Sequence, residues 1–142
     1  MIRKIEDKDI DKIMDIWLTS TIEAHKFISK EYWQNNYNIV RDVYIPMAET
    51  LIYEDEESIK GFISIINNEF IGALFVDTAY QGCGIGKQLI NYAMNKYKKL
   101  NLAVYKDNNK SVEFYINRGF KIIEEKVNED SGYEEYIMEN KL

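Results

Sequence analysis

The sequence is poor in the residues that build disulfides and metal sites. Among 142 residues it has one cysteine, Cys83, and one histidine, His25. A single cysteine cannot form an internal disulfide, and one cysteine with one histidine is too few for a typical zinc site. We therefore expect no metal, no disulfide framework and a cytoplasmic protein.

Long apolar runs and an excess of positive charge are also absent. No run approaches the length of a membrane span, and the first residues lack the apolar centre of a signal peptide. Lysine and arginine number 18 against 24 aspartates and glutamates, so the net charge is −6. This charge argues against nucleic-acid binding. It would favour a cationic partner, and it is equally the surface of an ordinary soluble protein.

The chain has enough apolar residues for one ordered core. Hydrophobic residues make up 46% of the sequence and are spread evenly, with no linker, repeat or low-complexity segment. A chain of this length fits one domain but not two. We therefore expect a single domain spanning residues 1–142.

Glycine is scarce, yet three of the seven glycines fall within residues 82–86. Residues 71–76 before them form an apolar run typical of a strand, and residues 85–97 after them have helical periodicity. A helix start carries unpaired N–H groups and partial positive charge, and glycines let the backbone approach an anion closely. The stretch predicts a phosphate-binding turn; a tight turn without a ligand is the alternative.

The spacing within this turn distinguishes between phosphate ligands. A Walker A loop would need glycine at position 81 and a hydroxyl residue at 88, where the chain has Gln81 and Gln88. A dinucleotide fingerprint would need glycine at 87 or 89, where the chain has Lys87 and Leu89. The pattern Gln/Arg-x-x-Gly-x-Gly/Ala does fit, at residues 81, 84 and 86. It resembles the acetyl-CoA-binding signature of the GNAT superfamily of N-acetyltransferases.

The remaining periodicities predict an alternation of strands and helices. Strands are expected at residues 1–5, 50–54, 59–66, 70–76, 101–105, 120–125 and 133–139. Helices are expected near residues 10–18, 29–45, 85–97 and 108–118. Asp7 or Asp9 would cap the first helix, Thr21–Ser29 interrupt the pattern, and Pro46 would end the second. Asn108 or Asn109 would cap the last helix, and Gly119 would end it. Residues Trp33, Tyr37, Val40, Val43 and Tyr44 would face inward from that second helix. This order predicts a three-layer α/β domain.

A second motif strengthens the resemblance. GNAT domains carry Asn-x-x-Ala/Ser-x-x-Phe-Tyr followed by Gly-Phe, and this chain has these residues in register: Asn108, Ser111, Phe114, Tyr115, Gly119 and Phe120. The chain is similar to the small, stand-alone bacterial members. The resemblance implies a three-layer α-β-α fold whose mixed, mostly antiparallel sheet is splayed at its centre.

The resemblance also implies a reaction. An acetyl-CoA-dependent N-acetyltransferase moves the acetyl group to a primary amine, on a small molecule, a peptide or protein lysine, or an N-terminus, by direct attack in a ternary complex. The N–H of Phe75 or Val76 would polarise the thioester carbonyl, and Tyr115 would protonate the leaving thiolate. The implied cofactor-binding residues are Leu74, Phe75, Val76, Gln81, Gly82, Cys83, Gly84, Ile85, Gly86, Lys87 and Asn108.

Several assignments stay open at this point. Phe114 is expected to pack in the core while Tyr115 faces the cofactor, since consecutive helical residues point about 100° apart. His25 is a candidate base or acceptor contact, and Trp33 is a candidate acceptor contact, although a lone histidine is more often structural and an aromatic residue more often core. No general base stands out, and the state could be monomer or homodimer. A non-catalytic acyl-CoA sensor and a nucleotide-phosphate binder are the competing functions.

Overall fold

The computed structural model describes residues 1–140; the last two residues of the expected domain, 141 and 142, lie outside the described residues. Seven strands form one sheet in the order β1-β2-β3-β4-β5-β7-β6, and all neighbours are antiparallel except β4 and β5. The strands are β1 (Ile2–Lys4), β2 (Glu49–Asp55), β3 (Ser58–Ile66), β4 (Phe70–Val76), β5 (Asn101–Tyr105), β6 (Phe120–Val127) and β7 (Glu134–Asn140).

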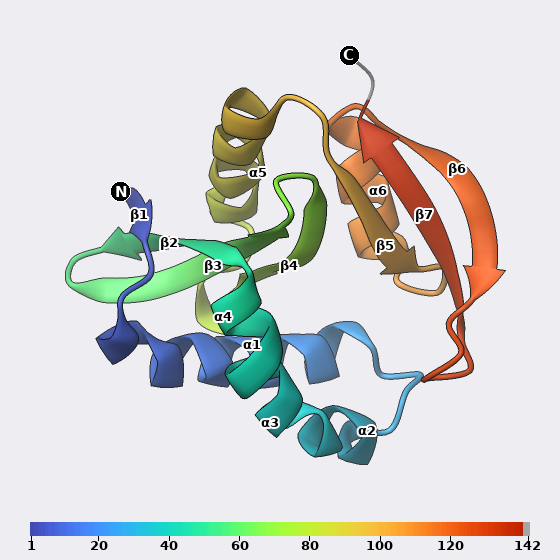
Figure 1. Ribbon diagram of the computed structural model, residues 1–142, viewed down its shortest axis with the longest axis horizontal. Helices are drawn as coiled ribbons and strands as arrows, with labels where there is room; N and C mark the ends of the chain where they lie inside the picture. The colour runs from blue at the N-terminus through green and yellow to red at the C-terminus, as the bar shows by residue number, and fades with distance from the viewer. Residues whose placement is uncertain (141–142) are drawn as a thin grey trace.

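Helices cover both faces of this sheet (Figure 1). One face carries α5 (Ile85–Tyr97) over β2–β4 and α6 (Asn109–Asn117) over β5 and β6. The other carries α1 (Ile10–Ala24) over β3 and β4, followed by α2 (Lys30–Asn35), α3 (Tyr37–Ile39) and α4 (Ile45–Met47). Short turns are η1 (Asp7–Asp9), the π-helical η2 (Val40–Tyr44) and η3 (Thr78–Tyr80). The expected three-layer fold is confirmed.

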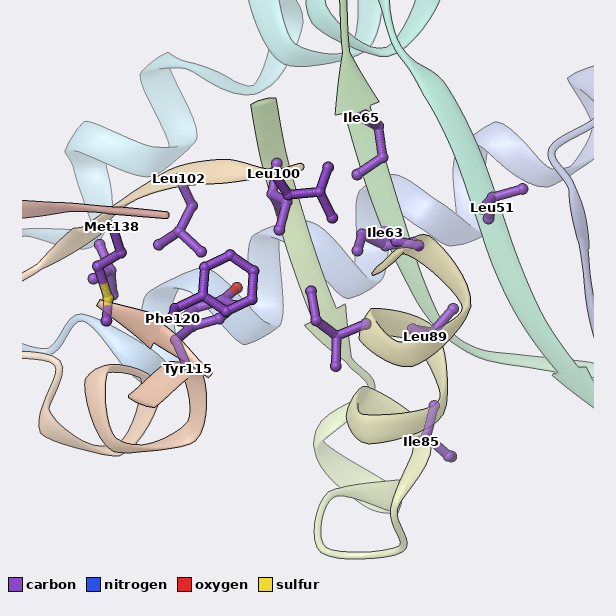
Figure 2. Packing of buried hydrophobic residues seen from close by; sticks show 14 residues of the cluster. Leu51, Ile63, Ile65, Ile85, Leu89, Leu100, Leu102, Tyr115, Phe120 and Met138 are labelled. Carbon is purple, nitrogen blue, oxygen red and sulfur yellow. The ribbon is translucent and has the colours of Figure 1, made fainter. Parts of the chain in front are cut away.

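Each face of the sheet has its own hydrophobic core. Under α5 and α6, fully buried Leu89 and Phe120 pack with residues of β2, β3 and β5 (Figure 2). Under α1 and α2, the core includes Trp17, Trp33 and Phe62. Burial of large apolar side chains supplies most of the stability of such layers. The two cores thus fix the helices against both faces of the sheet.

The sheet is splayed between β4 and β5. These parallel strands pair only at Phe70 with Asn101 and at Ile71 with Leu102. By contrast, β4 pairs with β3 from one end to the other, from Phe70 to Val76. The second half of β4 therefore lacks a strand partner on its β5 side, as the sequence resemblance implied.

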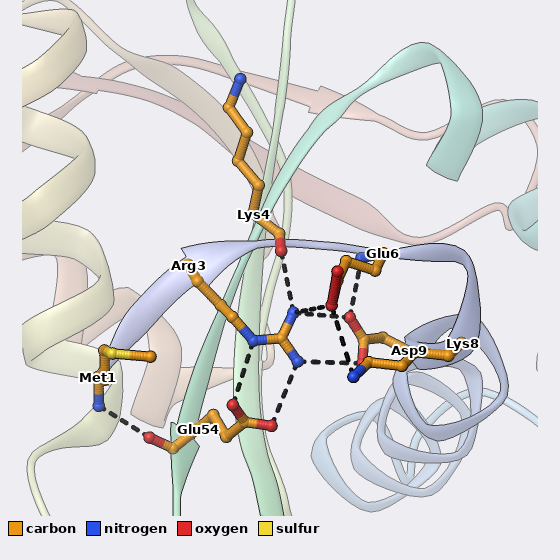
Figure 3. A network of polar contacts seen from close by, with 7 residues as sticks. All are labelled: Met1, Arg3, Lys4, Glu6, Lys8, Asp9 and Glu54. Carbon is orange, nitrogen blue, oxygen red and sulfur yellow. Dashed lines mark hydrogen bonds and ion pairs between the residues drawn. The ribbon is translucent and has the colours of Figure 1, made fainter.

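A polar network ties the N-terminus to the sheet (Figure 3). The guanidinium of Arg3 donates to the carboxylate of Asp9 at 2.9 and 3.1 Å and to that of Glu54 at 3.1 and 3.2 Å. The carboxylate of Asp9 also accepts the backbone N–H of Glu6 at 2.8 Å. Asp9 directly precedes α1 but uses its carboxylate in this network, not to cap a helix N–H.

Two expectations about the N-terminal helices are wrong. The first helix runs through Thr21 to Ala24, because its polar residues Ser20 and Thr21 are buried against the site and do not end it. The second is not one helix from 29 to 45 but three short helices and a π-helical turn, and Pro46 lies inside α4. A proline in the first turn of a helix removes no helical hydrogen bond.

The π-helical turn also changes which side chains are buried. Val43 and Tyr44 were expected to face inward, but they are 46% and 45% exposed. A π turn bonds i to i+5 instead of i to i+4, so a pattern read at 3.6 residues per turn loses its phase there. Trp33 precedes this turn and is buried as expected.

Candidate active site

The glycine turn adopts the backbone that its composition predicts. Gly82 and Gly84 have φ of +84° and +83°, a region that favours glycine, and Gly84 is the N-terminal cap of α5. A Cβ on either would meet open space. Gly86 is inside the helix, where a Cβ would lie 3.7 Å from Phe114 and Val76. The turn thus needs glycine at 82 and 84 for conformation and leaves the helix N-terminus uncovered.

A cavity of about 650 Å³ lies over this turn. Two cations, Lys87 and Lys110, and one carboxylate, Glu23, line it. Every residue of the expected cofactor-binding set lines it except Cys83, whose side chain is exposed. The cavity therefore combines the positive end of a helix with two lysines, a setting that suits an anionic ligand.

The backbone of β4 presents unpaired groups to the gap in the sheet. The N–H of Asp77 donates to the carbonyl of Lys60 on β3 at 2.8 Å. Hydrogen-bonding direction alternates along an antiparallel pair, so Phe75 also faces β3, whereas Leu74 and Val76 face the gap. The carbonyl of Val76 accepts the Ser20 hydroxyl and the Gln81 amide, each at 3.1 Å.

This alternation distinguishes the two N–H groups expected to polarise the thioester carbonyl. The N–H of Val76 faces the gap, whereas that of Phe75 faces β3. The N–H of Leu74 faces the same side as that of Val76. A ligand lying in the gap can pair with these groups as an added strand would.

Tyr115 lies where two cavities meet. It is 8% exposed, packs edge-on against Phe114 and Phe120, and lines both cavities. Burial alone raises the pKa of its phenol, so the hydroxyl keeps its proton at neutral pH. Phe114, expected in the core, is only partly buried and lines the larger cavity beside Tyr115. A protonated phenol at this junction can donate to a group in either cavity.

The second cavity, of about 370 Å³, opens on the α1–α2 face of the sheet. The residues it shares with the larger cavity are Leu74, Phe75, Asn108, Ser111 and Tyr115. Its other lining mixes aromatic and aliphatic side chains, and its charged residues in the described chain are Asp130 and Glu135. Two ligand spaces of opposite charge preference thus meet at the second half of β4.

Asn108 and His25 form a buried pair at this junction. The side-chain oxygen of Asn108 accepts the N–H of Ser111 at 3.3 Å and so caps α6, as expected. Its amide nitrogen lies 3.2 Å from Nε2 of His25, whose Nδ1 lies 2.8 Å from the carbonyl of Thr21. These contacts fit a neutral ring with its proton on Nδ1. Burial lowers the pKa of His25, which favours that neutral form.

Trp33 stacks against His25 in the smaller cavity. Their ring centroids are 5.1 Å apart, and Tyr105 packs edge-on against both rings. In the described chain, Nε1 of Trp33 is the one buried side-chain nitrogen or oxygen without a hydrogen-bond partner. A buried donor of this kind is uncommon, and it marks the cavity wall as a place for further polar contacts.

The structure thus brings the expected site residues together at one junction, apart from Cys83, while their roles stay predictions. Sequence reasoning missed Ser20, Tyr105, Asp130 and Glu135, whereas Lys110 was expected near the cofactor phosphates and lines the larger cavity. Ser20 and Thr21 gave a signal, since two polar residues fell on the buried face of α1. Adjacent glutamates at 134 and 135 gave none, because sequence alone does not say which one is buried.

The described residues contain neither a metal-binding cluster nor a membrane-spanning helix. Within residues 1–140, no three His, Cys, Asp or Glu side chains are grouped so that they could hold a metal ion. None of the helices over the same range is long and apolar enough to cross a membrane.

Comparison with known proteins identifies the family. The acetyltransferase (GNAT) domain model matches residues 14–142. The peptidyl-lysine N-acetyltransferase YiaC of Escherichia coli K12 is 35% identical over 124 residues, which cover 87% of this chain and 85% of that protein. YjaB of the same organism, also named a peptidyl-lysine N-acetyltransferase, is 28% identical over 121 residues, which cover 85% of this chain and 82% of that protein.

Solved structures agree on the fold. The solution structure of apo-form YjaB from E. coli superposes with a TM-score of 0.85 at 27% identity, covering 98% of this chain and 95% of that chain. The PaiA N-acetyltransferase of Thermoplasma acidophilum, solved in complex with coenzyme A, gives a TM-score of 0.83 at 23% identity, covering 100% and 98%. The splayed sheet, the glycine turn and these relatives together show that the chain belongs to the GNAT family of N-acetyltransferases.

Proposed function

We propose that the chain transfers the acetyl group of acetyl-CoA to a primary amine in a ternary complex, and that this amine is a lysine side chain of a peptide or protein. The observation that carries the proposal is the junction at Tyr115, where a cavity lined by lysines meets one lined by carboxylates. The relatives' names favour peptidyl lysine among the possible amines. In this proposal residues 1–142 form one catalytic domain.

The larger cavity would hold the acyl donor. The N-terminus of α5, Lys87 and Lys110 suit its phosphates, and the N–H groups of Leu74 and Val76, which face the gap, suit the carbonyls of its pantetheine arm. Asn108 lines the same space, although its amide and oxygen already contact His25 and Ser111. Its second amide N–H and the second lone pair of its oxygen remain for a contact with the donor.

The smaller cavity would admit the amine from the opposite face. The ammonium group loses a proton to water, and the free amine attacks the thioester carbon. The new N–C bond forms, the C–S bond breaks, the nitrogen releases its second proton to water to give the neutral amide, and the thiolate takes the proton of the Tyr115 hydroxyl. The N–H of Val76 would donate to the developing oxyanion, because it faces the gap. Solvent returns a proton to Tyr115 after the thiol leaves.

A thiol-release assay tests the proposal. The full chain is mixed with acetyl-CoA and a set of lysine peptides, small polyamines and peptides with a free N-terminus but no lysine. We expect release of free thiol with the lysine peptides, and a matching mass increase of one acetyl group on lysine. Tight coenzyme A binding without transfer to any amine would support the acyl-CoA sensor instead.

A second measurement checks the docking of the donor. Amide hydrogen exchange of Leu74 and Val76 should slow when coenzyme A is added, since these groups face the gap. The amide of Phe75, already facing β3, should change less. Equal protection at all three positions would argue against an added-strand mode of binding.

A further inference from the structure

Glu135 is a buried carboxylate in the smaller cavity. It is the second residue of β7 and lies directly opposite Tyr105 on β5, so the two side chains share the α1–α2 face of the sheet. Its exposure is 7%, and it lines the cavity. Its carboxylate accepts a hydrogen bond from the amide nitrogen of Asn128 at 3.4 Å. Within residues 1–140, no lysine or arginine lies within ion-pair distance of it.

The acidic side chains near Glu135 already have partners within the protein. Glu134 and Glu125 lie 3.8 and 2.6 Å from Nζ of Lys106 on the outer side of the hairpin. Asp130 is exposed, and its carboxylate accepts the hydroxyl of Tyr32. A buried anion with one long contact to a neutral amide is expensive to keep unless a cation joins it. Glu135 therefore differs from its neighbours in needing a partner from the cavity.

The rest of the wall suits the same partner. Trp33, Tyr32 and Tyr105 line the cavity and pack edge-on, with Tyr32–Trp33 and Trp33–Tyr105 centroids 5.0 and 6.3 Å apart. Aromatic faces attract ammonium groups, most strongly where water is excluded. No lysine or arginine is among the described residues that line this cavity, whereas Lys87 and Lys110 line the other. The wall is thus selective for positive charge.

We propose that Glu135 is a specificity-determining residue that binds the alkylammonium group of the acceptor as it enters between the aromatic rings. The proposal rests on the proposed function in one respect, that the bound cation is the acetyl acceptor. The ion pair forms while the amine is still protonated, and the proton leaves to water before attack. Glu135 thus acts on acceptor binding, and its loss changes the KM for the amine more than kcat.

Binding is measured without catalysis. Both tryptophans of the chain, Trp17 and Trp33, line this cavity, so intrinsic fluorescence reports on it. n-Butylamine is titrated as the cation and n-butanol as its uncharged counterpart. Wild type should respond to the amine at lower concentration than to the alcohol, and added salt should weaken only the amine. In Glu135→Gln this preference should disappear, while Glu134→Gln, an exposed neighbour, should keep it.

Catalysis gives the second arm. With a lysine peptide, the KM of Glu135→Gln should rise about 10–100-fold, the usual span for losing a hydrogen bond to a charged group. The affinity for coenzyme A should stay within about twofold, because Glu135 does not line the larger cavity. Glutamine can keep the Asn128 contact, and thermal unfolding of the variant shows whether the fold is retained.

The outcomes separate the two proposals. An active wild type with an unchanged KM in folded Glu135→Gln overturns the role of Glu135 and leaves the acetyltransferase proposal standing. A wild type inactive with every amine, which still binds butylamine through Glu135, overturns the acceptor chemistry and leaves the cation site standing. If Glu135→Gln does not fold, the salt titration of wild type decides: equal responses to amine and alcohol overturn the inference.

Discussion

The amide nitrogen of Asn108 lies 3.2 Å from Nε2 of His25 and joins the end of α1 to the start of α6. The two residues are 83 positions apart in the chain. The contact needs a ring nitrogen that accepts, and therefore a neutral histidine. The geometry of the junction thus depends on the protonation state of one side chain.

We predict that this pair makes stability depend on pH below about 6.5. Burial lowers the pKa of His25, so below its ordinary value of about 6.5 the unfolded chain binds a proton that the folded chain resists. Stability is full above that value and falls as the pH decreases. His25→Gln should unfold about 1 kcal/mol more easily at pH 7.5, and the difference should shrink at pH 5. Urea unfolding at both values measures it; a gap that does not change with pH would contradict the assignment.

Removing the hydroxyl of Tyr115 should slow the chemical step. Tyr115→Phe keeps the ring that packs on Phe114 and Phe120, so folding and coenzyme A affinity should change little. Both kcat and kcat/KM should fall by about 10²–10⁴-fold, the usual span for losing a general acid. Single-turnover acetylation is the decisive measurement, since product release could limit kcat.

The matched control is Tyr92→Phe. Tyr92 is 44% exposed on α5 and lines neither cavity. It should retain full activity. A single-turnover rate for Tyr115→Phe within about twofold of wild type would assign the proton to water or another group.

Substitutions at Gly86 should separate size from charge in the larger cavity. A Cβ there makes ordinary contacts at 3.7 Å in a right-handed helix, so Gly86→Ala should fold and gain up to about 1 kcal/mol. Gly86→Glu places a carboxylate where phosphates are expected, and Gly86→Gln places a neutral group of the same size. Calorimetry with coenzyme A should show binding abolished in the Glu variant and reduced less in the Gln variant. Equal losses would mean that size alone matters.

The Arg3 network should make the protein sensitive to strong acid. Hydrogen bonds from Arg3 hold the pKa of Asp9 below its ordinary value, and Asp9 is only 4% exposed. Its contribution is present above about pH 3.9 and is lost as the pH falls through the lower, folded value. Asp9→Asn should reduce the free energy of unfolding by about 1–3 kcal/mol at pH 7.

Acid unfolding provides the control for that network. The variant and wild type should become equally stable once the pH falls below the lowered pKa of Asp9, because the wild-type carboxylate is then protonated too. Asp7→Asn, an exposed neighbour outside the network, should behave like wild type. A stability difference that persists in strong acid would show that the loss in Asp9→Asn is steric.

Local signals in the sequence predicted the central elements well. The expected strand at residues 70–76 has the bounds of β4, and that at 59–66 differs from β3 by one residue. Asn108 caps α6, and Gly119 ends that helix with a φ of +97°. These features depend on local periodicity, caps and backbone conformation, all of which are written in neighbouring residues.

The errors lie where tertiary contacts override the local pattern. Ser20 and Thr21 look like a helix end by composition, but Ser20 bonds the carbonyl of Val76 across the site. In the π turn before Pro46 the backbone hydrogen bonds join residues five apart, which a 3.6-residue pattern cannot show. The role proposed for Glu135 depends on the cavity beside it, which the sequence does not show. The unexpected positions thus gather at the site, where function and not propensity selects the residue.

The splayed sheet has one more consequence, for how the catalytic geometry is maintained. Among the described residues the β1–β4 and β5–β7 half-sheets share two ladder pairs, so side-chain packing holds most of their length together. Contacts beyond the sheet join the segment after α1 to the β6–β7 loop: the ring of Phe27 lies 5.6 Å from that of Tyr133, and Tyr32 bonds Asp130. We expect ring size at positions 27 and 133 to influence the spacing between the halves. Phe27 and Tyr133 line neither cavity, so substitutions there should act without replacing a residue of the proposed site.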